Sequence, residues 1–235
     1  PTILHYLEHL VISSDRNLID FRFPVQHVIR PHQDFRGFAG RIASGIIAKG
    51  EEVVALPSGM RSRVKDIYIH GTTVDKAYES QSVVLSLTDE IDVSRGEMIV
   101  RPNNIPRMEQ SIDAIICWMD DKQPLALNTP YVLQHTTRTT QSRIKTLRYR
   151  VDVNTLHRQK ADRLSLNEIG RVEIEMAQPI FCDAYEHNRH TGSFILIDQI
   201  TNATVAAGMI RYETQTADKV FKDKAFDSIS ANVGR

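Results

Sequence analysis

The chain has 235 residues, with 29 Lys and Arg balancing 29 Asp and Glu, and 41% of its residues are hydrophobic. This length suits two compact domains, and the zero net charge argues against a strong overall attraction to nucleic acid or to an anionic membrane. No apolar run approaches the roughly 20 residues of a membrane-spanning helix. The N-terminus lacks a secretory signal, and Cys117 and Cys182 suit free thiols, so the cytoplasm is the expected compartment.

The first predicted element is a helix over residues 1–17. Leu4, Leu7 and Leu10 recur at helical spacing, and Pro1 suits the first turn of a helix because its missing N–H is not needed there. The pattern begins at the first residue with no cap before it. We therefore expect the chain to be a fragment, with this helix ending a domain that preceded it.

After residue 17 almost every segment is typical of strands and turns. Residues 82–88, 111–118 and 147–153 alternate apolar and polar side chains, and residues 171–176 do so most clearly. Tight turns are predicted between strands at Lys49-Gly50, Pro57-Ser-Gly59, His70-Gly71, Arg95-Gly96 and Thr191-Gly192. Many short strands with regular turns predict an all-β protein of antiparallel barrels.

The Pro- and Asn-rich string Arg101-Pro-Asn-Asn-Ile-Pro106 predicts a joint between two domains. We expect a first barrel over residues 18–104, a second over 105–212, and a polar tail or linker over 213–235. In the less strand-like segment 156–169, the pattern indicates that Leu156, Leu164 and Leu166 cover one barrel end.

Residues with catalytic or ligand-binding chemistry are scarce. No phosphate-binding loop string occurs, and the glycines of Arg36-Gly-Phe-Ala-Gly40 lead into a strand pattern, which favours close backbone packing. Cys182, Asp183, His187 and His190 match no metal-binding spacing. We assign no catalytic residue, cofactor or metal to the chain, and expect it to be inactive by itself.

Several strings resemble known families. Residues 25–53, including Asp34-Phe-Arg-Gly-Phe-Ala-Gly-Arg-Ile-Ala-Ser-Gly, resemble the second domain of translational GTPases such as elongation factor Tu. Asp89-Glu-Ile-Asp-Val-Ser-Arg-Gly-Glu and Asn188-Arg-His-Thr-Gly-Ser-Phe-Ile-Leu-Ile-Asp are more specific. Together they resemble the GTP-hydrolysing subunit of bacterial sulfate adenylyltransferase, over residues 1–211.

This resemblance implies two barrels like domains 2 and 3 of elongation factor Tu, with the GTPase domain before residue 1. It implies that the parent protein binds GTP and Mg²⁺, and that its GTP hydrolysis helps to drive synthesis of adenosine 5′-phosphosulfate from ATP and sulfate. The implied partners are the small catalytic subunit, the protein's own GTPase domain and, in some members, a following adenylylsulfate kinase domain.

Two features are candidates for an interaction surface. Residues 134–163 hold eight basic residues against two acidic ones, which indicates either a solvated barrel face or a surface for an anionic partner. Residues 185–192 form a distinctive polar tip, which indicates either a hairpin turn or a partner contact. The interface candidates are Arg148, Arg150, Tyr185, Asn188, Arg189, Thr191 and Gly192.

Two other functions remain open. The basic stretch favours barrels that bind tRNA or another nucleic acid in a translation factor, although the zero net charge opposes this. Scattered His and Asp residues leave open a free-standing enzyme whose site is assembled by the fold.

Overall fold

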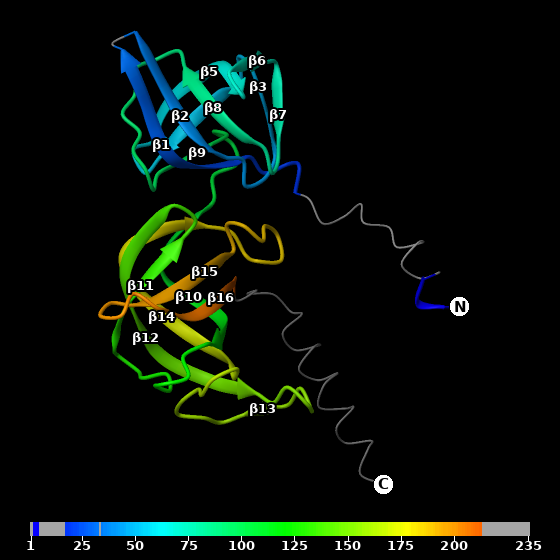
Figure 1. Ribbon diagram of the computed structural model, residues 1–235, viewed down its shortest axis with the longest axis vertical. Coiled ribbons are helices and arrows are strands. Elements are labelled where there is room, and N and C mark those ends of the chain that lie inside the picture. Colours follow the sequence, from blue (N-terminus) through cyan, green and yellow to red (C-terminus); the bar gives the residue numbers. More distant parts are fainter. Residues whose placement is uncertain (1, 5–16, 33, 213–235) are drawn as a thin grey trace.

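The computed structural model describes residues 2–4, 17–32 and 34–212. Its strands form two closed antiparallel barrels, one above the other in Figure 1. Ile3 and Leu4 have helical conformation, and the rest of the helix expected over residues 1–17, apart from Thr2 and Asn17, lies outside the described residues. The tail expected over 213–235 also lies outside them. Among the described residues, no helix is long and apolar enough to cross a membrane.

The first barrel is a ring of six strands in the order β4-β9-β1-β2-β8-β5, closed by pairing of β4 with β5. Strand β6 extends β5, and β3 and β7 form a separate two-stranded sheet. The bounds are β1 Arg22–His32, β2 Phe35–Arg41, β3 Ile46–Ala48, β4 Glu52–Leu56, β5 Met60–Ile69, β6 Thr72–Val74, β7 Lys76–Tyr78, β8 Ser82–Leu87 and β9 Met98–Val100.

The second barrel has the ring order β11-β15-β16-β10-β14-β12, closed by pairing of β11 with β12 and extended by β13. Residues 101–106 connect β9 of the first ring to β10 of the second. The bounds are β10 Arg107–Trp118, β11 Pro130–His135, β12 Arg138–Val151, β13 Arg158–Gln159, β14 Ile169–Cys182, β15 Ser193–Asp198 and β16 Thr204–Arg211.

Each barrel buries its own core, as period-two patterning predicts. In β14 the inward side chains of Val172, Ile174 and Met176 are at most 2% exposed, while Glu173 and Glu175 face outward. The expected glycine turns at Gly50, Gly59, Gly71 and Gly96 have φ between 72° and 91°, a conformation that suits glycine.

One expectation is wrong in part. Of the three leucines expected to cover a barrel end, Leu164 is fully buried, but Leu156 and Leu166 are 66% and 46% exposed. Leu156 closes a surface turn, through a hydrogen bond of 2.7 Å from its backbone N–H to the backbone oxygen of Asp152. The close backbone packing expected at the glycines of segment 36–40 is confirmed, since a Cβ on Gly40 would stand 2.5 Å from the Pro24 carbonyl oxygen, although the segment lies within β2 and does not precede a strand.

Candidate interaction site at the joint between the barrels

An apolar cluster joins the two barrels. Strands β4 and β9 bury one set of side chains in the first barrel and turn a second set outward, toward Phe181 of β14 in the second barrel. The outward set is at most 5% exposed and consists of Val54, Leu56, Met98 and Val100. Burying one such side chain contributes about 1.5–3 kcal/mol, so the barrels are held against each other by several kcal/mol.

A buried ion pair crosses the same joint. Arg22 of β1 donates from Nε and Nη2 to the two carboxylate oxygens of Asp183, at 2.9 and 3.0 Å. Its Nη1 donates to the backbone oxygen of Asn104, in the connection between the barrels, at 2.7 Å. The side chains of Arg22 and Asp183 are only 3% and 15% exposed. Because a charge this buried needs a partner, the pair fixes how the barrels meet.

The predicted polar tip, residues 185–192, supplies the third part of the joint. Asn188 is 4% exposed and donates from Nδ2 to Ser44 Oγ of the first barrel at 2.7 Å. Its Oδ1 accepts from the backbone N–H of His190 and Thr191, at 3.1 and 3.3 Å. Thr191 donates from Oγ1 to Asp183 at 2.6 Å. One loop therefore bonds the first barrel and supports the ion pair.

Gly192 is required in this loop by close packing. A Cβ at this position would lie 2.4 Å from the Cα of Tyr185 and 2.6 Å from the backbone oxygen of Asn188. Its φ lies outside the left-handed region, unlike the other predicted turn glycines. The turn pattern at Thr191-Gly192 thus marked the right residue, but close approach of the backbone is the reason for glycine here.

The remaining candidates lie outside the joint. Arg189 is exposed, Tyr185 is half-buried, and the side chains of Arg148 and Arg150 are 37% and 35% exposed. The Nη2 of Arg148 lies 3.6 Å from the carboxylate of Asp113, and the backbone of Asp113 is in register with that of Arg211 between β10 and β16. Arg211 in turn pairs with Glu186 of the loop.

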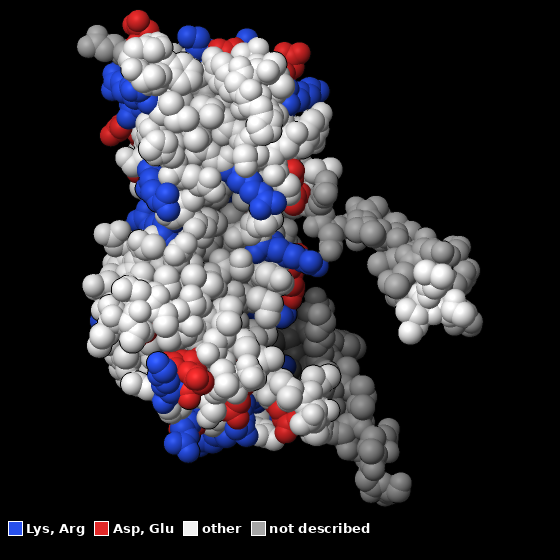
Figure 2. All heavy atoms as spheres, viewed as in Figure 1, with Lys and Arg blue, Asp and Glu red and all other residues white. Residues whose placement is uncertain are grey.

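The fold sets carboxylates against half of the basic residues in the stretch 134–163. Strand β12 carries these basic residues and pairs with β14, which lies between β12 and β10. Outward carboxylates of β14 and β10 face the basic residues of β12. Figure 2 accordingly shows basic and acidic side chains side by side at the lower end of the second barrel. Among the described residues, ion pairs join Arg143 to Glu175, Lys145 to Glu173, Arg148 to Asp113 and Arg150 to Glu168, at 4.0, 4.0, 3.6 and 2.5 Å.

The residues weighed as metal ligands do not converge. Asp183 is engaged by Arg22, and buried Cys182 lies 3.5 Å from the hydroxyl of Tyr212. His187 and His190 are exposed. Within the described part of the chain, no three His, Cys, Asp or Glu residues are grouped as metal ligands would be.

His135 makes the joint sensitive to pH. It is 1% exposed, and its Nε2 lies 2.7 Å from the Thr191 backbone oxygen, so Nε2 carries the proton and donates. Burial lowers the pKa of His135 below its ordinary value of 6.5. The folded protein thus binds fewer protons than the unfolded chain between these two pKa values, and stability is lost as pH falls below 6.5.

We predict that, through His135, the free energy of unfolding falls as the pH is lowered from 7.5 to 5.5, with a slope that cannot exceed about 1.4 kcal/mol per pH unit. A His135→Gln variant, which keeps an N–H donor without a titrating group, should lose less stability over the same range. Urea unfolding at pH 7.5 and 5.5 measures both proteins. Equal losses in the two would contradict the assignment.

Arg22, Asp183 and the outward cluster of β4 and β9 were missed at the sequence level. One available signal was the run of consecutive apolar residues at Val53–Leu56 and Met98–Val100, which is typical of strands covered on both faces. No local signal pairs Arg22 with Asp183, since 161 positions separate them.

Comparison with known proteins agrees with this architecture. The family described as "GTP-eEF1A C-terminal domain-like" matches residues 111–211. The structure of Sup35 complexed with GDP superposes with a TM-score of 0.75 over 90% of this chain and 52% of that one, at 21% identity. The fold is therefore that of the barrel pair in translation-factor GTPases.

Curated relatives are closer in sequence. The bifunctional enzyme CysN/CysC of Rhodopirellula baltica is 49% identical over 97% of this chain, and sulfate adenylyltransferase subunit 1 of Bacteroides fragilis is 48% identical over 94%. The chain belongs to the sulfate adenylyltransferase subunit 1 family. It spans less than half the length of these relatives, 36% and 46% respectively.

Proposed function

We propose that the chain forms the barrel domains of the GTP-hydrolysing subunit of a cytoplasmic sulfate adenylyltransferase. Its role there is to couple GTP hydrolysis to the synthesis of adenosine 5′-phosphosulfate and pyrophosphate from ATP and sulfate. GTP and Mg²⁺ bind in a domain outside this chain. The partners are that GTPase domain and the small catalytic subunit, together with a kinase domain in relatives named CysN/CysC.

The buried joint is the observation that carries the coupling role. A nucleotide switch alters a partner's chemistry only if some surface differs between its two states. Barrels that share an apolar cluster and the Arg22–Asp183 pair move as one body, and they transmit a displacement at one end to the other without absorbing it.

The full-length subunit combined with the catalytic subunit tests this function. GTP should raise the yield of adenosine 5′-phosphosulfate from ATP and sulfate above the yield without GTP, and a non-hydrolysable GTP analogue should not. Both products and the GDP formed are measured by chromatography. An unchanged yield with GTP would contradict the coupling role, as would turnover of any nucleotide by the 235-residue chain alone.

The exposed basic residues near the loop are the proposed contact with the catalytic subunit, since surface charges steer a diffusing partner. The double variant Arg148→Glu and Arg189→Glu in the full-length subunit should raise the Kd of the complex at least tenfold, or about 1.4 kcal/mol. Arg61→Glu, on the first barrel, is the matched control. Unchanged affinity would exclude this contact. The coupling role would still be tested separately, by the GTP-dependent yield described above.

A further inference from the structure

The tip of the β11–β12 hairpin packs against a turn of the first barrel. His135 and Arg138 are paired across the hairpin, so Thr136 and Thr137 form its two-residue turn. A Cβ on Gly96, in the turn that precedes β9, would lie 3.5 Å from the Cα of Arg138 and 3.5 Å from the backbone oxygen of Thr137. The hairpin of the second barrel therefore touches a turn of the first.

Each barrel brings one arginine to this contact. Arg95 directly precedes Gly96, and consecutive Cα atoms are about 3.8 Å apart, so the Cα atoms of Arg95 and Arg138 are separated by at most about 9 Å. Arg95 donates from Nη1 to the backbone oxygen of Gln26 at 3.1 Å, and Arg138 donates from Nη2 to Gln178 Oε1 at 3.2 Å. Both acceptors are uncharged, so these bonds leave the charge of the two guanidinium groups unbalanced.

No carboxylate balances the two charges within the part of the chain that the structure describes. The ion pairs found there include neither Arg95 nor Arg138. Glu97 is the acidic residue nearest to Arg95 in the sequence, and its Oε2 accepts from the backbone N–H of Ser94 at 3.1 Å instead. On the left at the level of the joint, Figure 2 shows basic side chains with no acidic side chain beside them. Two unbalanced cations this close together attract an anion.

The hairpin tip also holds polar atoms that the protein leaves without a partner. Four buried side-chain atoms of this kind occur among the described residues, and two of them are Thr137 Oγ1 and Arg138 Nε. Thr136, beside them, has a φ of 50°, a conformation that β-branched residues rarely adopt. Because an unpaired buried donor is unfavourable, packing alone does not account for Arg138 here. A small shift of its guanidinium toward a bound anion would give Nε an acceptor.

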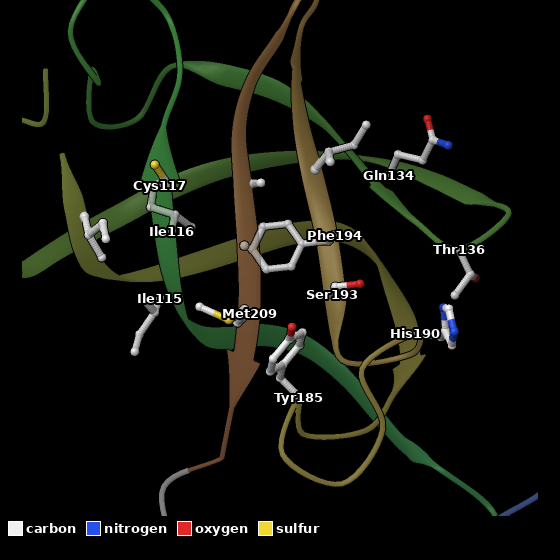
Figure 3. A pocket seen from close by; sticks show the side chains of 14 residues that line it. Ile115, Ile116, Cys117, Gln134, Thr136, Tyr185, His190, Ser193, Phe194 and Met209 are labelled. Atoms are coloured by element: carbon white, nitrogen blue, oxygen red, sulfur yellow. The ribbon is translucent and has the colours of Figure 1, made fainter. Parts of the chain in front are cut away.

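A pocket beside β10 begins at the same tip but does not include the two arginines. It has a volume of about 560 Å³, and Figure 3 shows Thr136 and His190 close together at its edge. None of its lining residues is Asp, Glu, Lys or Arg. The charge near the tip therefore lies outside this pocket, with Arg95 and Arg138.

We propose that Arg95 and Arg138 together bind one small polyvalent oxyanion, such as sulfate, phosphate or pyrophosphate, at the joint between the barrels. A guanidinium suits such an ion because its parallel N–H groups reach two oxygens at once. Since each barrel supplies one arginine, the bound ion bridges the barrels and stabilises the joint. Arg138 belongs to the basic stretch 134–163, for which the sequence left an anionic partner open. The site is separate from the proposed coupling to GTP hydrolysis and does not depend on it.

Titration calorimetry on the 235-residue chain tests the site. The domain to which we assign GTP lies outside this chain, so anion binding there cannot be mistaken for binding to the barrels. Sulfate, phosphate and pyrophosphate are titrated separately at constant ionic strength, with sodium chloride as the balancing salt, so that general salt effects cancel. We expect one ion per chain, and the ranking of the three affinities shows whether a sulfate or a phosphate group is preferred. At about ten times its Kd, the ion should raise Tm by about 3–6 °C.

Variants of the two arginines show whether they share one ion. Arg95→Gln and Arg138→Gln should each weaken binding at least tenfold, and the double variant should be little weaker than either, since the ion needs both side chains. Arg138→Lys keeps the charge without the planar fork, so its affinity should lie between those of Arg138→Gln and the unchanged chain. Arg61→Gln, at an exposed arginine of the first barrel, is the control and should bind normally. Fluorescence of Trp118 checks that every variant is folded.

Equal affinity in the unchanged chain and in the two single glutamine variants would overturn the proposal. Additive losses in the double variant would mean two independent weak contacts, which would overturn the shared site. Arg138→Lys binding no more tightly than Arg138→Gln would show that charge at this position does not attract the ion. Binding of an oligonucleotide, but of none of the three small ions, would assign the arginines to nucleic acid and would also overturn the proposal. None of these outcomes bears on the GTP-dependent yield, which tests the proposed function separately.

Discussion

Replacing Arg22 with methionine should lower the free energy of unfolding by about 3 kcal/mol. The substitution leaves the carboxylate of Asp183 without its two strong donors in a site that is only 15% exposed. Breaking a buried pair typically costs about 3–5 kcal/mol, and the residual exposure of Asp183 places this case at the lower end.

Chemical denaturation followed by fluorescence measures this loss in the second barrel. Trp118 is the only tryptophan of the chain and packs edge-on against Tyr131, with ring centroids 5.9 Å apart. Arg61→Met is the control, because the Arg61–Glu52 pair is exposed and worth about 0–1 kcal/mol. A loss below about 1 kcal/mol for Arg22→Met would show that the pair does not hold the barrels together.

Gly192→Ala should lower the free energy of unfolding by a similar amount, about 2–4 kcal/mol. Its Cβ would meet backbone atoms of Tyr185 and Asn188, which cannot rotate away as a flexible side chain would. Overpacking of this kind costs about 1–3 kcal/mol, and opening the loop would also break the hydrogen bond from Asn188 to Ser44, worth about 1 kcal/mol.

A double-mutant cycle tests whether the stability loss of Gly192→Ala arises in the loop at the joint. Gly192→Ala and Asn188→Ala should be strongly non-additive because both open the same loop. Gly50→Ala is the control: it lies in an open turn with no atom within 4 Å of a new Cβ, and its cost should simply add to that of Asn188→Ala. Additive losses for Gly192→Ala would mean that its strain is absorbed away from the joint.

Much of the fold could be predicted because period-two patterning is a local property. Residues 171–176 lie in β14 with the expected side inward, and the predicted glycine turns separate strands. Continuous apolar runs were interpreted less accurately. Alternation was assigned to residues 111–118, but Ile115 and Cys117 are apolar as well, and both line a pocket beside β10. Such a run indicates a second covered face, and periodicity cannot say what covers it.

For the charged residues, the sequence pattern was clear, but which charges pair with each other could not be predicted from it. The excess of basic residues over 134–163 is real in the sequence, yet the fold sets carboxylates of β10, of β14 and of Glu168 just before β14 against half of them. Those carboxylates lie from 18 to 35 positions away from the basic residues they face. A count of charges along the chain therefore overstated the surface potential, because pairing depends on which strands become neighbours.

The sequence by itself determined the all-β class, the barrel plan and the family. These depend on local periodicity, turn chemistry and distinctive strings. The tertiary structure alone decided that Asn188 and Thr191 face the joint, that Arg22 pairs with Asp183, and that an apolar pocket lies beside them. The physical reason is that strand order in a closed barrel brings together residues whose contacts leave no trace in local spacing.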